Sequence, residues 1–174
     1  MASTAISGYT RRILVSKGVP GGIVTMRAGG AEIYPGHCVT CEGNTWPDVM
    51  LPDANTDSVF GIASCPPDKD IDTVLADNSE FDVYLCGSGA IVYGYRKGAD
   101  GGGDTVAGDI MVAYGIAAAG SVVALKNALQ DITGDCANTV MATQYKRMLA
   151  MVGRAVETLA SSANTVPIKM ILSV

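Results

Sequence analysis

Short apolar runs separated by glycine-containing or aspartate-containing breaks recur along this chain and limit what it can fold into. The clearest runs cover residues 57–63, 81–87, 90–95 and 107–115. Each is rich in Val, Ile or Tyr and is bounded by turn-forming residues, which is typical of a β-strand. A last run over 166–174 has the same character. Several strands in series predict an all-β fold, or a β-rich fold with at most one or two short helices, built as a small β-barrel.

The chain is predicted to consist of an extended N-terminal arm and one body. Its 174 residues suit a single domain. Residues 1–20 hold one apolar stretch among small and polar residues and lead into a Pro-Gly-Gly break, so we predict an arm there. We expect residues 21–174 to form one β-barrel-like domain, with loops at 64–79 and 98–104 and an insertion near 127–147.

Three local patterns add detail. Gly29 and Gly30 lie between two short strand candidates, at 23–27 and 32–34, and such a tight link predicts a hairpin. Residues 140–159 fit two structures, because their apolar side chains fall at helical spacing but a glycine interrupts them, so a helix and a buried strand both stay open. No repeat of fixed period is evident.

The composition favours a protein that is covered by partners. Hydrophobic residues make up 48% of the chain and charged residues 17%. Few charges remain to cover a solvated surface, which favours apolar contact patches over the alternative of a robust Ala- and Gly-rich monomer. The net charge of −5 and the lack of a basic cluster argue against nucleic-acid binding. We predict no membrane span, because no apolar stretch reaches the roughly 18 residues that a span needs. We also predict no signal peptide, because residues 1–8 lack a basic region followed by an apolar core.

The cysteines and the single histidine are the candidates for chemistry. Cys38 and Cys41 have the Cys-x-x-Cys spacing of half a zinc site. The other cysteines stand singly, at Cys65, Cys86 and Cys136. A complete site needs a second pair, so we favour reduced, buried cysteines and predict no cofactor. His37 follows a Pro-Gly turn with no nucleophile motif beside it, and we expect it to be exposed to solvent. The sequence predicts no catalytic set.

A series of short phrases resembles one family of viral proteins. The phrases are Val-Phe-Gly-Ile-Ala at 59–63, the stretch 83–89, Val-Ala-Gly-Asp at 106–109, Val-Gly-Arg-Ala-Val-Glu at 152–157, and an apolar C-terminal strand. In this order they resemble the small capsid decoration, or cement, proteins of tailed bacteriophages and similar archaeal viruses. The resemblance spans roughly residues 50–174, apart from the stretch 127–147. It implies a small β-barrel or β-tulip body, often trimeric, that bridges neighbouring subunits of an assembled shell without a chemical step.

We therefore predict a structural virion protein of the capsid surface, made in the host cytoplasm. Its expected partners are the major capsid protein and further copies of itself, as a homotrimer. The residues expected to make capsid or subunit contacts lie in the arm and are Tyr9, Arg11, Arg12, Ile13 and Leu14. The guanidinium of Arg12 suits a charge-assisted bond to a carboxylate. The alternatives are another virion component, such as a turret, minor shell or tail-tube protein, and a small β-barrel that binds a ligand or, through Cys38 and Cys41, a metal.

Overall fold

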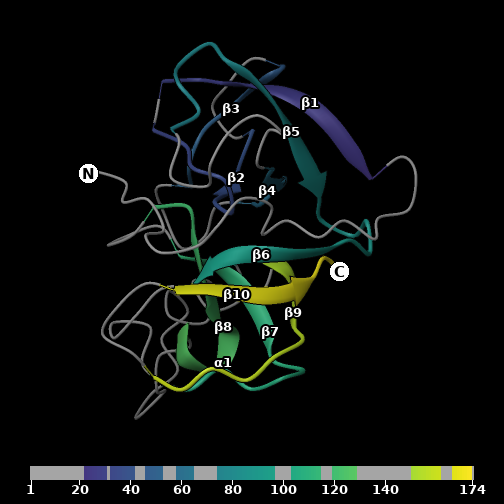
Figure 1. Cartoon of the computed structure of the whole chain (residues 1–174), viewed down its shortest axis with the longest axis vertical. Helices are drawn as coiled ribbons and strands as arrows, with labels where there is room; N and C mark the ends of the chain where they lie inside the picture. The colour runs from purple at the N-terminus through teal and green to yellow at the C-terminus, as the bar shows by residue number, and fades with distance from the viewer. Residues whose placement is uncertain are drawn as a thin grey trace, which may run out of the picture.

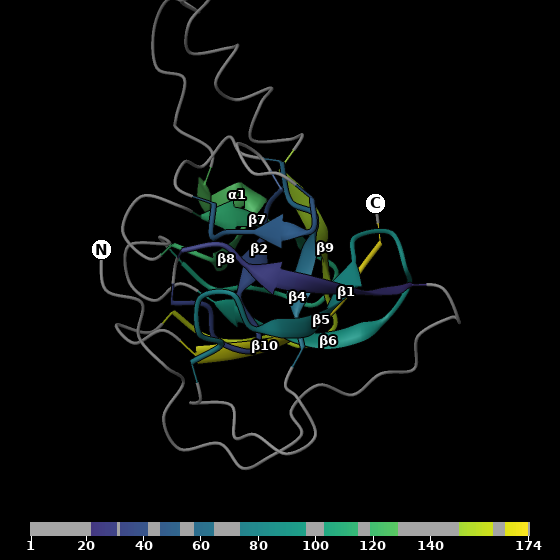
Figure 2. The same ribbon diagram turned by 90° about the horizontal axis from the view of Figure 1, so that it is seen from above.

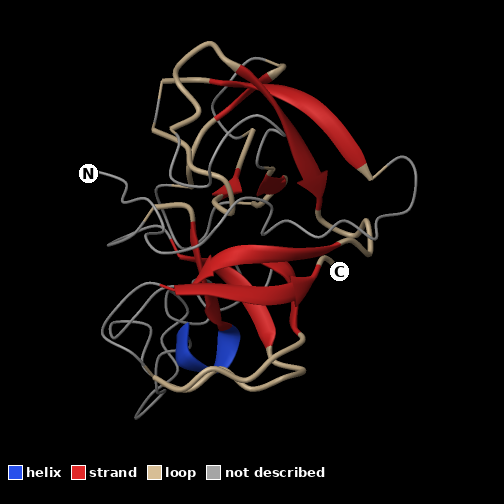
Figure 3. Ribbon diagram, viewed as in Figure 1, coloured by secondary structure: helices blue, strands red, loops and turns tan. Residues whose placement is uncertain are grey.

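The computed structural model describes residues 22–30, 32–41, 46–52, 58–64, 74–96, 103–114, 119–128, 150–161 and 166–173. Their strands form two five-stranded sheets, stacked along the longest axis of the molecule (Figure 1). Nearly all regular structure is strand, with a single short helix in the described part (Figure 3). The prediction of an all-β fold with at most one or two short helices is confirmed.

The first sheet curls on itself in the upper half of Figure 1. Its strands are β1 (Ile23–Ala28), β2 (Cys38–Val39), β3 (Asp48–Val49), β4 (Gly61–Ala63) and β5 (Glu80–Leu85), in the order β2-β4-β5-β1-β3. Strand β1 runs antiparallel to β5 and parallel to β3. Just beyond the two outer strands, Thr40 and Met50 exchange backbone hydrogen bonds of 2.9 and 3.0 Å. This bridge draws the two edges of the sheet together.

The second sheet is a closed barrel. It contains β6 (Ile91–Arg96), β7 (Ile110–Tyr114), β8 (Ser121–Ala124), β9 (Met151–Ala155) and β10 (Val166–Ile171), in the order β10-β6-β8-β7-β9. The short helix α1 (Leu125–Ala128) follows β8 directly. Strand β10 pairs with both β6 and β9, so the last apolar run of the sequence, predicted to be a strand, closes the barrel.

Strand β9 resolves the ambiguous stretch at residues 151–155 in favour of a strand. A Cβ atom added at Gly153 would overlap the carbonyl oxygen of Ile171, which lies in β10. The glycine that interrupts the helical spacing is therefore the residue that lets two barrel strands approach closely.

Two apolar cores fill the molecule. One lies within the first sheet around Met26, Val39 and Phe81. The other fills the barrel and continues into the first sheet, where Ile62 and Tyr84 pack against barrel residues. Viewed from above, the first sheet lies over the barrel (Figure 2). The two sheets therefore share a core rather than meeting through a polar interface.

The predicted hairpin around Gly29 and Gly30 is wrong. Strand β1 pairs with β5 and β3, and Ile33 instead forms a bridge with Leu75, more than forty residues away. Gly30 does adopt a left-handed φ of 87°, so the turn residue was recognised but its pairing partner was not. Glycine-rich turns identify where a chain bends, and they do not determine which strands then pair.

The same corner is built once in each sheet. In the first, the turn 76–79 precedes β5, and Asn78 N–H donates to the carbonyl of Ala28 at the end of β1, over 2.8 Å. In the barrel, the turn 106–109 precedes β7, and Gly108 N–H donates to the carbonyl of Ala155 at the end of β9, also over 2.8 Å. In the first sheet the partner strand, β1, comes before the turn in the sequence, whereas in the barrel the partner strand, β9, comes after it. The two corners are therefore not related by a fixed sequence period.

Candidate functional site

The predicted contact residues of the arm, from Tyr9 to Leu14, lie outside the described residues. The same holds for most of the predicted loops at 64–79 and 98–104 and of the insertion near 127–147. The candidate residues that the structure does describe lie in the body, and they include Cys38, Cys41 and His37.

Cys38 and Cys41 do not face a common site. The side chain of Cys38 is fully buried in the core shared by the two sheets, and its thiol donates to the carbonyl of Ser121 over 3.4 Å. Cys41 lies three residues along the same extended segment and packs against the separate core of the first sheet. Burial raises the pKa of both thiols, and of Cys86 to about 12, which suppresses the thiolate form that metals bind. The arrangement gives no support to a zinc site at this pair.

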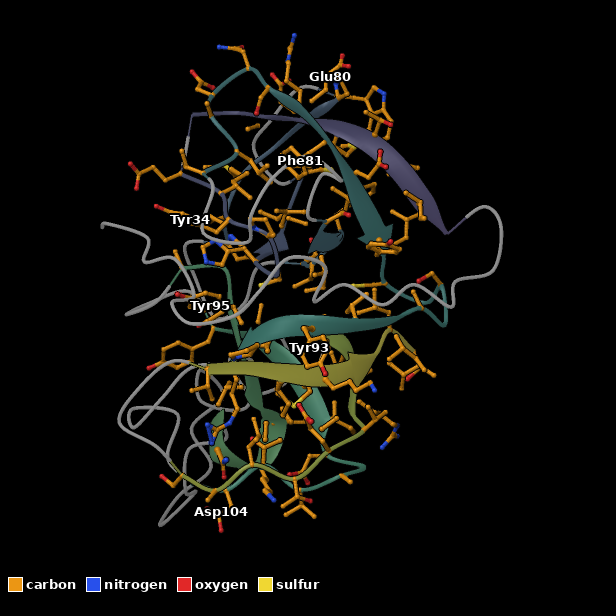
Figure 4. The ribbon with its side chains drawn as sticks, in the orientation of Figure 1. Tyr34, Glu80, Phe81, Tyr93, Tyr95 and Asp104 are labelled. Atoms are coloured by element: carbon orange, nitrogen blue, oxygen red, sulfur yellow. The ribbon has the colours of Figure 1, made fainter. Side chains whose placement is uncertain are left out.

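The prediction that His37 is exposed is wrong. Its side chain is fully buried at the junction of the two sheets. Its ring meets Tyr34 and Tyr95 edge to face, with centroid separations of 5.6 and 4.8 Å, and these two tyrosines are labelled at the junction in Figure 4. The Tyr34 N–H donates to His37 Nδ1 over 3.2 Å. The turn was recognised correctly, but the barrel covers it, which a local motif does not reveal.

The environment of His37 makes it a structural residue. Burial lowers its pKa to about 3, so the ring is neutral near pH 7. Because Nδ1 accepts a hydrogen bond, the proton of the neutral ring is assigned to Nε2, which is buried and has no hydrogen-bond partner among the described residues.

Arg96 is another buried polar side chain, and it makes several hydrogen bonds. It lies at the end of β6 and is 2% exposed. Its Nε donates to Thr105 Oγ1 over 3.0 Å, and a terminal nitrogen donates to the carbonyls of Gly103 and Ala160 over 3.4 and 3.0 Å. The guanidinium thus fastens two loop segments to the barrel. Burial lowers its pKa, and the charge of Asp104 opposes that shift.

In the described part of the chain, no group of three or more His, Cys, Asp or Glu residues is placed to hold a metal ion. Two of the described carboxylates pair with basic side chains, and others accept hydrogen bonds from backbone N–H groups or a hydroxyl, as Asp77 does from Gly30 and Asp82 does from Thr25. Lys126 Nζ lies 2.7 Å from Asp109, and Arg27 pairs with Asp48. These pairs lie at the surface and contribute little to stability.

The surface of the body carries the features that the sequence alone did not locate. Five large apolar side chains are exposed on described segments: Ile23, Trp46, Val74, Val106 and Val156. Trp46 is the most exposed, at 63%, and its ring meets Phe60 edge to face. The sequence signal that could have located this surface was the Trp-Pro pair at the start of a strand. A proline in that position is typical of a sheet edge, and an exposed aromatic residue beside it is typical of a contact surface.

These apolar residues gather at three places. Val106 and Val156 lie at the barrel corner, where the hydrogen bond between Gly108 and Ala155 joins their segments. Val74 lines a hollow of about 300 Å³ with Gly30, Glu32, Ala76 and Asp77, at the equivalent corner of the first sheet. Ile23 and Trp46 flank the outer edge of β1. In Figure 4, Glu80 lies at the end of the molecule that holds the corner of the first sheet, and Asp104 lies at the end that holds the barrel corner.

Comparison with known proteins adds no assignment. No protein-family model matches the chain, and no curated protein matches it. None of the helices in the described ranges is long and apolar enough to cross a membrane.

Proposed function

We propose that this chain is a structural virion protein, a β-barrel subunit that decorates an assembled capsid and cements neighbouring subunits without catalysis. The observation that carries the proposal is the set of large apolar side chains held exposed on strands and tight turns, in a chain with only 17% charged residues. Large apolar side chains held exposed on a rigid scaffold, where few charges surround them, favour surfaces that partners cover.

The separation of these groups favours a bridging role. A subunit that joins neighbours must contact at least two of them at once, and the described apolar groups lie at both ends of the body and along the edge of β1. Two simultaneous weak contacts give a combined affinity far above either alone. Binding to the assembled shell, and not to its free subunits, then stabilises the assembly by mass action.

The interior supports a role without chemistry. His37 is neutral and buried, the thiol of Cys38 is buried with a raised pKa, and burial raises the pKa of the partly buried Cys86 thiol to about 12. A nucleophile or general base needs access to substrate, which these groups lack. The proposed partners are the major capsid protein and further copies of the chain in a homotrimer, on the outer surface of the particle.

The test is binding of the intact chain to capsid shells stripped of decoration. We expect the chain to sediment with the shells and to raise the temperature at which they rupture. A variant with Val106→Asp and Val156→Asp places two charges in one proposed contact and is expected to lower occupancy at least about tenfold, since each buried unpaired charge costs more than 1.4 kcal/mol. Thr158→Asp, at an exposed neighbouring residue, adds a charge at the same corner without removing an apolar group.

A chain that stays in the supernatant at all concentrations would overturn the proposal. Imaging of decorated particles separates the related alternatives, because a turret or tail-tube protein would occupy a vertex or the tail and not the shell faces. Equal occupancy by the double variant and the intact chain would show that this corner is not a contact.

A further inference from the structure

The outer side of β1 pairs with β3 only at its C-terminal end, and among the described residues its N-terminal half has no backbone partner on that side. Hydrogen bonds from Leu85 N–H to Gly22 and from Ala28 N–H to Ser79 show that the even-numbered residues of β1 pair inward with β5. The backbone groups of the odd-numbered residues therefore point away from β5. At Arg27 this outer side is occupied, since its N–H donates to the carbonyl of Pro47 over 3.0 Å.

Proline ends the pairing on that outer side. The parallel ladder between β1 and β3 runs through Arg27 N–H to Pro47 and Gly29 N–H to Val49. One step earlier, the donor opposite the Thr25 carbonyl would be the N–H of residue 47, and proline has none. The outward N–H and C=O groups of Ile23 and Thr25 thus have no backbone partner among the described residues. Such an edge is a template for an added strand.

The edge is flanked by apolar and acidic groups. Ile23 is 41% exposed, and the register with β3 places the 63% exposed Trp46 beside the same edge. The side chains around it are acidic: Asp48, Asp77, Glu80 and Asp82 surround the single base Arg27. The hydrogen bond and charge of Asp48, and then the charges of Glu80 and Asp77, raise the pKa of Arg27. A partner strand should therefore be extended, apolar and basic.

The arm of the same sequence has this chemistry. Residues 1–21 contain Arg11, Arg12 and Lys17 and no acidic residue, so residues 22–174 hold nine basic and 17 acidic side chains. Between the bases lies Ile13-Leu14-Val15, a run with strong strand propensity. Pairing of β1 with β1 of a second copy would bring two acidic faces together and is disfavoured.

We propose that residues 11–16 of one copy add as a strand to the outer edge of β1 in a second copy. The inference rests on the proposed function for its biological purpose, since it supplies the contact between neighbouring subunits. An arm-to-edge contact is head-to-tail, and such contacts close into rings, a trimer among them.

The experiment uses full-length chains in solution, without shells. Ile13→Pro with Leu14→Pro disables the arm, and Thr25→Pro disables the edge without removing a bond to β5. Thr25→Val is the matched control, because it keeps the outward N–H and loses only the hydroxyl that donates to Asp82 over 2.9 Å. Mass is measured by sedimentation across protein concentration, and circular dichroism confirms that each variant is folded.

We expect the unmodified chain and Thr25→Val to associate. We expect the arm variant and the edge variant each to stay monomeric at concentrations at least tenfold above those at which the unmodified chain associates. Mixing the two variants restores one intact arm and one intact edge, and is expected to give a heterodimer. A monomeric unmodified chain, or a mixture that stays monomeric, would overturn the inference, and the latter result would mean that the arm binds its own body.

A peptide of residues 9–17 provides a second measurement that does not depend on the folding of Thr25→Pro. It is expected to dissociate the oligomer and to shift the fluorescence of Trp46, the single tryptophan. N-methylation of alternate amides is expected to abolish binding for one set and to spare the other, because an edge strand bonds through every second residue. Equal effects of both sets would contradict strand addition. Self-association with no binding to shells would leave this inference standing and refute only the proposed function.

Discussion

The imidazole of His37 meets the ring of Tyr95 edge to face, with 4.8 Å between ring centroids, and this contact joins the first sheet to the barrel. Backbone hydrogen bonds lie on both sides of it: Tyr95 N–H donates to Gly36, and Cys38 N–H donates to Gly120, over 3.0 and 2.8 Å. The turn that carries His37 is thus inserted between the sheets. We expect the two sheets to unfold together in one transition.

The burial of His37 predicts a loss of stability on mild acidification. Its pKa is about 3 in the folded protein and about 6.5 in the unfolded chain, so the unfolded state alone takes up a proton as the pH falls below 6.5. The free energy of unfolding is expected to fall by about 2 kcal/mol between pH 7 and pH 5. Urea denaturation at several pH values measures it.

The matched variant is His37→Asn, which keeps an acceptor near the Tyr34 N–H but does not titrate. It is expected to be less stable overall and nearly independent of pH over the same window, because carboxylates titrate mainly below it. Parallel pH profiles for the two proteins would show that His37 is already protonated, or solvent-exposed, in the fold.

Gly120 is predicted to tolerate no side chain. Its φ is +78°, and an added Cβ would lie 2.7 Å from Leu51 and 2.9 Å from the ring of His37. Gly108 also has a left-handed φ, of +95°, but open space around it. Gly108→Ala should therefore cost about 1 kcal/mol for backbone strain alone, and Gly120→Ala about 2–5 kcal/mol, because overpacking adds to the strain. Chemical denaturation of both variants measures the difference, and equal costs would refute the close packing at the junction.

Arg96 is predicted to stabilise the barrel through its hydrogen bonds and not through its charge. Arg96→Met removes the donors to Thr105, Gly103 and Ala160 and leaves the buried hydroxyl of Thr105 and two part-buried carbonyls without these bonds, which should lower the free energy of unfolding by about 3 kcal/mol. Arg154 is the control, since it is exposed and donates to the Gly108 carbonyl, and Arg154→Met should cost no more than about 0.5 kcal/mol. Similar losses in both variants would contradict a specific role for Arg96.

The sequence predicted individual strands better than their pairing. The runs at 81–87, 90–95 and 107–115 became β5, β6 and β7, because strand formation depends on local propensity and turn residues. The partners of β1 were missed, since β5 lies more than fifty residues further along the chain and register depends on tertiary packing. Periodicity alone likewise left 140–159 open, and the contact of Gly153 with β10 shows what decides its strand.

The candidate site was the least predictable part. Among the described residues, the unpaired stretch at the start of β1 follows from the lack of a donor on Pro47 opposite Thr25, and that relation requires the register of β3 against β1. Local sequence identified Pro-Gly before His37 as a turn but gave no sign that the barrel covers it. Where the role of a residue depends on long-range packing, the sequence around it gives no local signal of that role. The difference in charge between the arm and the body, in contrast, follows from composition alone.

Labelling of the cysteines gives a last prediction. Cys38 is fully buried, and Cys41 lies partly exposed on the same segment. Brief alkylation of the folded protein, read by peptide mass spectrometry, should modify Cys41 and spare Cys38, while denaturant exposes both, because reaction requires an accessible thiolate. If the two thiols held zinc, both would be protected, and a chelator would release them together. That outcome would contradict the opposite orientation of the two side chains and revive the metal-binding alternative.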